Sequence, residues 1–198
     1  MLEIRALSRP GLAPVDLDLA KGEALALLGP SGSGKTLLLR AIADLDPNEG
    51  QISLEGAARE AMPAPDWRRQ VTYLSAEPGW WAARGADHFP DPAAGRALFP
   101  ALALPDGIMD QPITELSTGE RHRLALARVL VQSPRVLLLD EPTSGLDQDT
   151  ARAVEALLRE RLTNGTALLF STHDEQLAGR LGDRKLRVNH GRVTAEAP

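Results

Sequence analysis

The chain contains 198 residues and carries a formal net charge of −5 at pH 7. A chain of this length can bury one substantial α/β core with room for a small inserted subdomain, which favours one domain over two. It contains no cysteine, which excludes a disulfide framework, a cysteine-ligated zinc site and a thiol nucleophile.

The acidic balance gives no support to nucleic-acid binding, and we expect no nucleic-acid partner. The sequence has no run of about 18 uncharged apolar residues, and its N-terminus lacks the apolar centre of a signal peptide. We therefore expect a cytosolic protein. The four histidines are scattered without the paired spacing of metal ligands.

The first 28 residues begin with short alternations of apolar and polar residues, interrupted by Pro10, Gly11 and Pro14. This pattern predicts antiparallel strands joined by turns, which would form a small β layer. The continuous apolar run at 24–28 is instead typical of a buried parallel strand.

Directly after this run the chain reads Gly-Pro-Ser-Gly-Ser-Gly-Lys-Thr, a complete P-loop for nucleotide phosphates. The glycines let the backbone curl so that successive N–H groups point at one anion, and the following helix adds its positive end. Lys35 would reach the β- and γ-phosphates, and the hydroxyl of Thr36 would contact Mg²⁺. The P-loop residues expected to bind the nucleotide are Gly29, Pro30, Ser31, Gly32, Ser33, Gly34, Lys35 and Thr36.

Beyond the P-loop, segments with helical periodicity alternate with short apolar segments. This alternation predicts a parallel sheet with right-handed crossovers, and therefore an α/β fold. Residues 78–115 differ, because they contain six prolines and little strand signal, and we interpret them as a compact, mainly helical insert. The expected helices are 35–45, 119–131 and 147–162, and the expected strands are 51–54, 71–74, 135–140 and 166–171.

Asp140 and Glu141 follow an apolar segment at the position where ligands bind in open α/β sheets. Considered alone, the segment could be any buried strand that ends in an acidic turn. With a P-loop upstream, Asp140 is expected to hold Mg²⁺ through water, and Glu141 is expected to polarise the attacking water beside the γ-phosphate.

Residues 116–120 read Leu-Ser-Thr-Gly-Glu and precede a helical pattern. Considered alone, this is a well-capped helix start, with Ser117 as N-cap and Glu120 three residues later. Together with the P-loop, it resembles the signature loop in the nucleotide-binding subunits of ABC transporters. The resemblance implies that Ser117 and the Gly119 amide bind the γ-phosphate of an ATP held by the opposite subunit, in a homodimer or heterodimer.

Further elements of that family follow in order. Residues 144–147 read Ser-Gly-Leu-Asp and resemble the D-loop that crosses the dimer interface. His173 follows the last apolar segment and resembles the switch histidine that contacts the γ-phosphate, although a lone histidine there would be an ordinary polar loop residue. The resemblance therefore makes Glu141 and His173 the expected catalytic residues, with Thr36 and Asp140 at Mg²⁺.

The resemblance implies a P-loop NTPase core with a mainly parallel sheet, an N-terminal antiparallel β layer and a short helical subdomain at about 79–115, within one ABC ATPase domain at 1–198. It implies a small single-cassette subunit that hydrolyses ATP with Mg²⁺ and drives a separate transmembrane permease. Such a subunit would be cytoplasmic and peripheral to the inner face of the cell membrane. Two alternatives stay open, a nucleotide-switched assembly or regulatory module with weak turnover and a soluble ABC ATPase outside transport.

The chain departs from the family pattern at several positions. Ala76 stands where the family usually has a glutamine that contacts Mg²⁺, and alanine cannot bind a cation. Either a water molecule replaces the glutamine, or Glu77 substitutes for it, or the turnover of ATP is weak. We expect slow but real hydrolysis. Thr118 and Glu120 replace the commonest signature residues, which is a mild change because Ser117 and its neighbouring glycine remain.

Aromatic residues are absent from residues 1–28, where the family usually stacks the adenine base. Arg5 or Arg9 could stack on the base instead, or be ordinary surface arginines, and we expect weak discrimination between ATP and GTP.

Three aromatic residues, Trp80, Trp81 and Phe89, lie near the start of the insert, which is short for the family. They either line the groove that receives a helix of the permease or fill the core of the insert.

Overall fold

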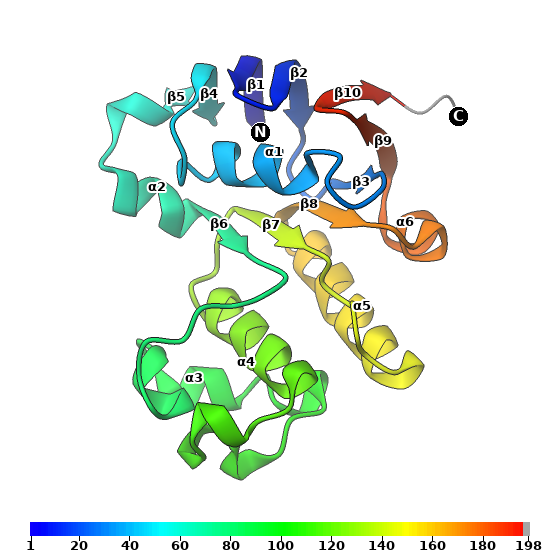
Figure 1. Ribbon diagram of the computed structural model, residues 1–198. Coiled ribbons are helices and arrows are strands. Elements are labelled where there is room, and N and C mark those ends of the chain that lie inside the picture. Colours follow the sequence, from blue (N-terminus) through cyan, green and yellow to red (C-terminus); the bar gives the residue numbers. More distant parts are fainter. Residues whose placement is uncertain (196–198) are drawn as a thin grey trace.

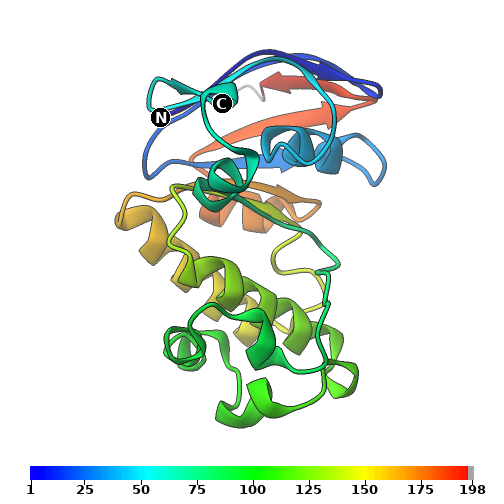
Figure 2. The ribbon, with the colours of Figure 1, turned by 90° about the vertical axis from the view of Figure 1, so that its left-hand side faces the viewer.

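The computed structural model describes residues 1–195. Figure 1 shows a small sheet at the top, a larger sheet across the middle with helix α1 (Lys35–Ile42) between the two, and further helices beneath. The quarter-turn view in Figure 2 shows the same order of layers, with the insert at the end distant from the small sheet. The expected α/β architecture is confirmed.

The smaller sheet is antiparallel and has the strand order β2-β1-β4-β5. Leu2 pairs with Leu19 on one side and with Leu54 on the other. Along the first two strands buried residues alternate with more exposed ones, so one face of this sheet packs on the core. The predicted N-terminal β layer is therefore present. Its strands are β1 (Leu2–Arg9), β2 (Leu12–Leu19), β4 (Glu49–Leu54) and β5 (Ala57–Ala58).

The larger sheet has the order β10-β9-β3-β8-β7-β6, and all neighbours are parallel except β10 and β9. Its parallel strands end at one edge, so the loops that follow them meet there. The last two strands were not predicted from the sequence. The strands are β3 (Ala24–Leu28), β6 (Val71–Leu74), β7 (Val136–Asp140), β8 (Ala167–Thr172), β9 (Arg184–Asn189) and β10 (Arg192–Ala195).

Each face of the larger sheet contributes to a separate hydrophobic core. Along β7, Leu137 and Leu139 belong to the core beside the insert and the lower helices, whereas Val136 and Leu138 belong to the core around α1 and the small sheet. Successive side chains of a strand point to opposite faces, so a strand covered on both faces is apolar throughout. Each fully buried leucine or valine contributes about 1.5–3 kcal/mol.

The helices begin at capping residues that the sequence contains. Ser117 caps one helix through a capping box with Glu120, and the side chain of Asp147 accepts hydrogen bonds from the first backbone N–H groups of another. The predicted helices are therefore confirmed to within about two residues, except at the end of α1. The other helices are α2 (Ala64–Gln70), α4 (Thr118–Val131), α5 (Gln148–Thr163) and α6 (Glu175–Leu181).

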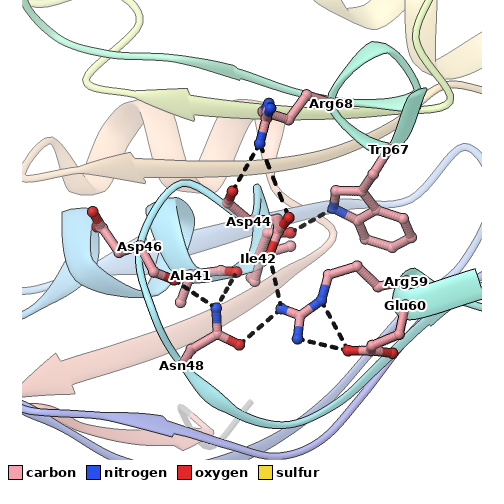
Figure 3. A network of polar contacts seen from close by, with 9 residues as sticks. All are labelled: Ala41, Ile42, Asp44, Asp46, Asn48, Arg59, Glu60, Trp67 and Arg68. Carbon is pink, nitrogen blue, oxygen red and sulfur yellow. Dashed lines mark hydrogen bonds and ion pairs between the residues drawn. The ribbon is translucent and has the colours of Figure 1, made fainter. Parts of the chain in front are cut away.

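Helix α1 ends at Ile42, three residues before its predicted end, because side chains bind its last carbonyl groups (Figure 3). Asn48 Nδ2 donates to the carbonyl oxygen of Ala41 at 3.3 Å, and Trp67 Nε1 of α2 donates to that of Ile42 at 3.0 Å. Asp44 then adopts a left-handed φ of 56°. These contacts satisfy carbonyl groups that a helix end leaves without partners, and they hold α2 against the P-loop helix.

The insert contains one short helix, α3 (Pro92–Arg96), and otherwise single 3₁₀ turns rather than longer helices. Pro100, Pro105 and Pro112 stand at the start of three of these turns. Proline lacks an N–H donor, so it is tolerated at the start of a turn but does not extend one. The insert is thus helical in single turns. The 3₁₀ turns are Gly85–His88, Pro100–Leu102, Asp106–Asp110 and Ile113–Glu115.

Candidate functional site

The P-loop connects β3 to α1, and its backbone requires glycine. Gly29 has a φ of 153°, and a Cβ there would lie 2.3 Å from the carbonyl oxygen of Val188 in β9. Lys35 Nζ donates hydrogen bonds across the loop to the carbonyl oxygens of Gly29 at 2.7 Å and Pro30 at 3.1 Å. The hydroxyl oxygen of Ser33 is buried and has no hydrogen-bond partner among residues 1–195. A hydroxyl donor and an ammonium group therefore lie together in the loop, which suits a phosphate.

Asp140 lies at the carboxyl end of β7 beside the P-loop helix. Thr36 Oγ1 donates to Asp140 Oδ2 at 2.6 Å, so the two predicted Mg²⁺ residues are in contact. The hydroxyl of Ser171 in β8 also donates to this carboxylate, and the hydroxyl of Tyr73 in β6 donates to Oδ2 at 3.2 Å. Carboxylate and hydroxyl oxygens are the donors that Mg²⁺ prefers, so the residues present fit this ion.

Tyr73 and Ser171 are site residues that the sequence analysis did not identify. Ser171 is the register partner of Asp140, and Tyr73 lies on β6, the other neighbour of β7. The sequence signal that could have identified them is a hydroxyl residue near the carboxyl end of each predicted strand, 71–74 and 166–171, where ligands bind in open α/β sheets. Burial raises the pKa of Tyr73 well above its usual range, and the charge of Asp140 adds to this effect. Its hydroxyl therefore remains a hydrogen-bond donor at neutral pH.

Glu141 and His173 form a second pair at the same edge of the sheet. His173 Nδ1 lies 3.0 Å from Glu141 Oε2. Glu141 has a left-handed φ of 52°, and its backbone N–H donates to the carbonyl oxygen of Ser171 at 3.2 Å and to its hydroxyl at 3.1 Å. The loops after β7 and β8 thus bring together the two residues expected to be catalytic.

These residues surround one pocket of about 650 Å³. It extends from the P-loop to the carboxyl ends of the strands, and its size suits a small-molecule ligand. Gly29 and Pro30, which begin the P-loop, are not among its lining residues. The pocket is lined by Ser31, Gly32, Ser33, Gly34, Lys35, Thr36, Leu37, Ala76, Asp140, Glu141, Ser144 and His173.

Ser117 and Gly119 do not line this pocket. The backbone N–H of Ser117 donates to Glu120 Oε2 at 2.9 Å, and the N–H of Glu120 donates to the Ser117 hydroxyl oxygen at 3.2 Å. The hydroxyl of Ser117 donates to the same carboxylate at 2.7 Å, and these bonds lower the pKa of Glu120. The segment is therefore a capped and exposed start of α4, separate from the P-loop of its own chain.

The family model for ABC transporters matches residues 12–144 of the chain. The chain belongs to the ABC transporter family. It is 39% identical to the sulfate/thiosulfate import ATP-binding protein CysA of Xylella fastidiosa over 198 aligned residues. This alignment covers 92% of the present chain and 57% of that protein. It is 37% identical to the hemin import ATP-binding protein HmuV of Streptomyces coelicolor, over all of this chain and 76% of that protein. The chain thus spans under three fifths of the length of the first relative.

Solved structures of ABC cassettes share the fold. A structure described as an ATP-binding subunit of an ABC transporter matches with a TM-score of 0.89 at 24% identity, over all of this chain and 89% of that one. A dimeric ATP-binding cassette in a post-hydrolysis state, bound to ADP and phosphate, matches over the full length of both chains with a TM-score of 0.78 and 23% identity. Within residues 1–195, no helix of this ABC family member is long and apolar enough to cross a membrane.

Ala76, which the sequence comparison with the family pattern places at the usual glutamine, lines the pocket. Glu77 is exposed and is not among the residues that line it, and its backbone oxygen accepts a hydrogen bond from Ser75 Oγ at 2.6 Å. The conformation shown therefore does not place Glu77 as a substitute.

Both arginines considered for base stacking have ionic partners. Arg5 Nη1 lies 2.5 Å from Asp18 Oδ1, and Arg9 Nη1 lies 2.5 Å from Asp46 Oδ2. The Arg9 side chain is mostly buried. Stacking on a base would require either arginine to leave its carboxylate, which weakens the stacking hypothesis.

The aromatic residues of the insert separate into two environments. Phe89 is buried in the lower core, which confirms the core interpretation for this residue. Trp80 is partly buried against that core, whereas Trp81 is 73% exposed. The guanidinium of Arg128 lies 4.7 Å from the ring centroid of Trp80 and 4.8 Å from that of Trp81, in cation–π contact with both.

Proposed function

We propose that this chain is the ATP-hydrolysing subunit of an ABC transporter. The convergence of Lys35, the Thr36–Asp140 pair and the Glu141–His173 pair on one pocket carries the proposal. A phosphate-binding loop, a carboxylate for Mg²⁺ and a carboxylate for water are the parts that phosphoryl transfer to water requires. The named relatives are ATP-binding proteins, which supports ATP as the nucleotide.

Catalysis in this pocket would rest on positioning and charge. Lys35 exchanges its bonds to two loop carbonyl groups for bonds to the β- and γ-phosphates, and the Ser33 hydroxyl gains an acceptor. Mg²⁺ held by Thr36 and Asp140 would neutralise phosphate charge. Glu141 orients and polarises the attacking water, and His173 holds the Glu141 carboxylate and contacts the γ-phosphate.

A complete site would need a second subunit. Ser117 and the Gly119 amide are placed at an exposed helix start, where backbone N–H groups favour an anion, but outside the nucleotide pocket of their own chain. In a dimer, Ser117 of one subunit would contact the ATP in the P-loop of the other. ATP would then close the dimer and its hydrolysis would open it. The similarity of fold to a dimeric cassette supports this arrangement.

The partner would be a separate membrane permease, which places the subunit at the inner face of the membrane. The relatives are named as import ATP-binding proteins, so their names favour import. The exposed Trp81, held beside Trp80 by Arg128, offers the insert an aromatic contact for such a partner.

Ala76 favours slow turnover, because no side chain at this position can contact Mg²⁺. The same observation supports a second candidate, a nucleotide-switched module that binds ATP and dimerises with very little hydrolysis. The two candidates differ in multiple turnover, which the following measurement distinguishes.

The test compares phosphate release by the unaltered protein with release by Glu141→Gln, with ATP and Mg²⁺ in excess. We expect sustained release that falls by at least about a hundredfold in the variant, because the group that polarises water is lost. Glu160→Gln, an exposed carboxylate on α5, is the matched control and should retain full activity. Release that stops after one phosphate per subunit would favour the switch module, and equal rates in both variants would overturn the assignment of Glu141.

A further inference from the structure

A second cavity lies at the opposite end of β7 from the nucleotide pocket. It has a volume of about 380 Å³ and lies among the first residues of β7 and β8, the ends of β2 and β4 and the last turn of α5. Val136 at the start of β7 lines it, whereas Asp140 at the end of the strand lines the nucleotide pocket. A strand of this length separates the two sites by roughly 13 Å. The cavity is therefore distinct from the site described above.

Two glycines bring the turn after β2 against the turn before β8. Gly22 has a φ of 72° and Gly165 a φ of 94°, conformations that side chains disfavour. A Cβ on Gly22 would lie 3.0 Å from the carbonyl oxygen of Leu162, and a Cβ on Gly165 would lie 2.4 Å from Cε of Lys21. The side chain of Lys21 therefore lies directly over Gly165, beside the cavity that it lines.

The cavity gathers more positive than negative charge. The basic side chains that line it are Lys21, Arg135 and Arg161, and the acidic one is Glu55. Glu55 forms an ion pair with Arg135. Lys21 and Arg161 have no ion-pair or hydrogen-bond partner in the described part of the chain. Two cationic groups beside one cavity are thus left without a matching anion.

Of the basic residues that line the cavity, Arg161 is the least exposed. Its Nε is buried and lacks a hydrogen-bond acceptor within residues 1–195. An oxyanion is the acceptor that suits a guanidinium best, and a ligand in the cavity would reach this one through its terminal nitrogens rather than through the enclosed Nε. Asn164, one turn further along the chain, adds an amide donor to the same cavity.

Ser133 and Thr166 add hydroxyl groups to the lining, and the exposed side chain of Met1 adds apolar surface. We propose that this cavity binds a small organic oxyanion, a phosphate ester or carboxylate with an apolar body, whose charged group pairs with Lys21 and Arg161. The apolar body lies against Met1, and a volume of this size suits a ligand of a few to a dozen heavy atoms. A single subunit supplies all the lining residues, and binding at this site does not depend on ATP hydrolysis.

The test follows the backbone amide NMR signals of the ¹⁵N-labelled protein as butyl phosphate is added. We expect saturable shifts at residues 21, 22, 133 and 135 and at residues 161–166. Arg161→Gln should weaken this binding about tenfold, because one charge-assisted contact is lost. Arg152→Gln makes the same charge change at an exposed position on the same helix, and it should bind as the unaltered protein does.

A second variant tests the same cavity if Arg161→Gln fails to fold. Asn164→Asp places a carboxylate at an exposed position on the cavity, and it should weaken binding by repulsion. Inorganic phosphate should bind more weakly than butyl phosphate, because it lacks the apolar body. Shifts confined to residues 29–36, or equal affinities of the Arg152 and Arg161 variants, would overturn the proposal.

Discussion

The hydroxyl of Tyr73 donates a hydrogen bond to Asp140 Oδ2 at 3.2 Å, from the strand adjacent to the one that ends in Asp140. Thr36 Oγ1 donates to the same oxygen at 2.6 Å. The orientation of the carboxylate is therefore fixed by residues on both sides. A carboxylate held in this way is oriented for Mg²⁺ before the ion arrives, which is the effect of neighbouring hydrogen bonds in metal sites.

Tyr73→Phe should raise the Mg²⁺ concentration needed for half-maximal phosphate release by about tenfold, because the carboxylate loses an orienting hydrogen bond. Because the raised pKa of Tyr73 keeps its hydroxyl protonated, this effect should be the same between pH 7 and pH 9. The measurement is a Mg²⁺ titration of the rate at saturating ATP. An unchanged titration curve would show that Thr36 and Ser171 suffice to orient Asp140.

Gly29→Ala should abolish nucleotide binding and lower the free energy of unfolding by about 3 kcal/mol or more. The added Cβ would lie 2.3 Å from the carbonyl oxygen of Val188, which is backbone and cannot turn aside. Gly32→Ala is the matched control, because its φ is also positive but no atom lies within 4 Å of the added Cβ. It should cost only about 1 kcal/mol of backbone strain. Urea unfolding of both variants checks the difference, and equal losses would contradict it.

Asp46 should stabilise the fold in a pH-dependent way. Its hydrogen bond to Arg40, reinforced by Arg9, holds the pKa of its carboxyl well below the usual range. A carboxyl whose pKa is lower in the folded state contributes stability above its unfolded pKa of about 4, and this contribution is lost as the pH falls.

Asp46→Asn should therefore be less stable than the unaltered protein by about 1 kcal/mol at pH 7. The difference in stability should shrink below about pH 4, because Asp46 is then protonated in the unfolded chain but still ionised in the folded protein. Denaturant unfolding at a series of pH values measures it, with Glu160→Gln as the control. A difference that grows on acidification would refute the assignment.

Trp81→Ala should remove association with a membrane partner and leave the fold nearly intact. Trp81 is 73% exposed, and its replacement removes its ring contacts with Arg128 and His88 at a cost of about 1 kcal/mol. The check is co-purification of a polytopic membrane protein from detergent-solubilised membranes. Leu45 is another exposed apolar residue, distant from Trp81 in the sequence, and Leu45→Ala should retain the partner. Retention by Trp81→Ala as well would place the docking surface elsewhere.

The linear order of motifs was enough to predict the nucleotide pocket. The P-loop, Asp140, Glu141 and His173 each lie at or just after the end of an apolar strand, and parallel strands bring their carboxyl ends to one edge. Tyr73 was missed because it lies inside a strand and carries no motif of its own. Its role depends on the pairing of β6 with β7, which is a contact between residues far apart in the chain.

The structure of the insert was predicted less completely from the sequence than the nucleotide pocket was. Its prolines correctly indicated that no strand forms there, but not whether the turns would be α-helical or 3₁₀. The separate environments of Phe89 and Trp81 also could not be read from the chain, because both are large aromatic residues only eight positions apart. Which one is buried depends on the packing of the insert against α4.

The α/β class, the family and the residues that meet in the nucleotide pocket could be predicted from the amino-acid sequence alone. These features follow from local rules, since hydrophobic periodicity sets the elements and glycine spacing sets the P-loop. The partners of Asp140, the ion pairs of Arg5 and Arg9, and the cationic cavity around Lys21 and Arg161 are visible only in the folded chain. Each of these joins side chains separated by many residues, and their proximity depends on how whole strands and helices pack.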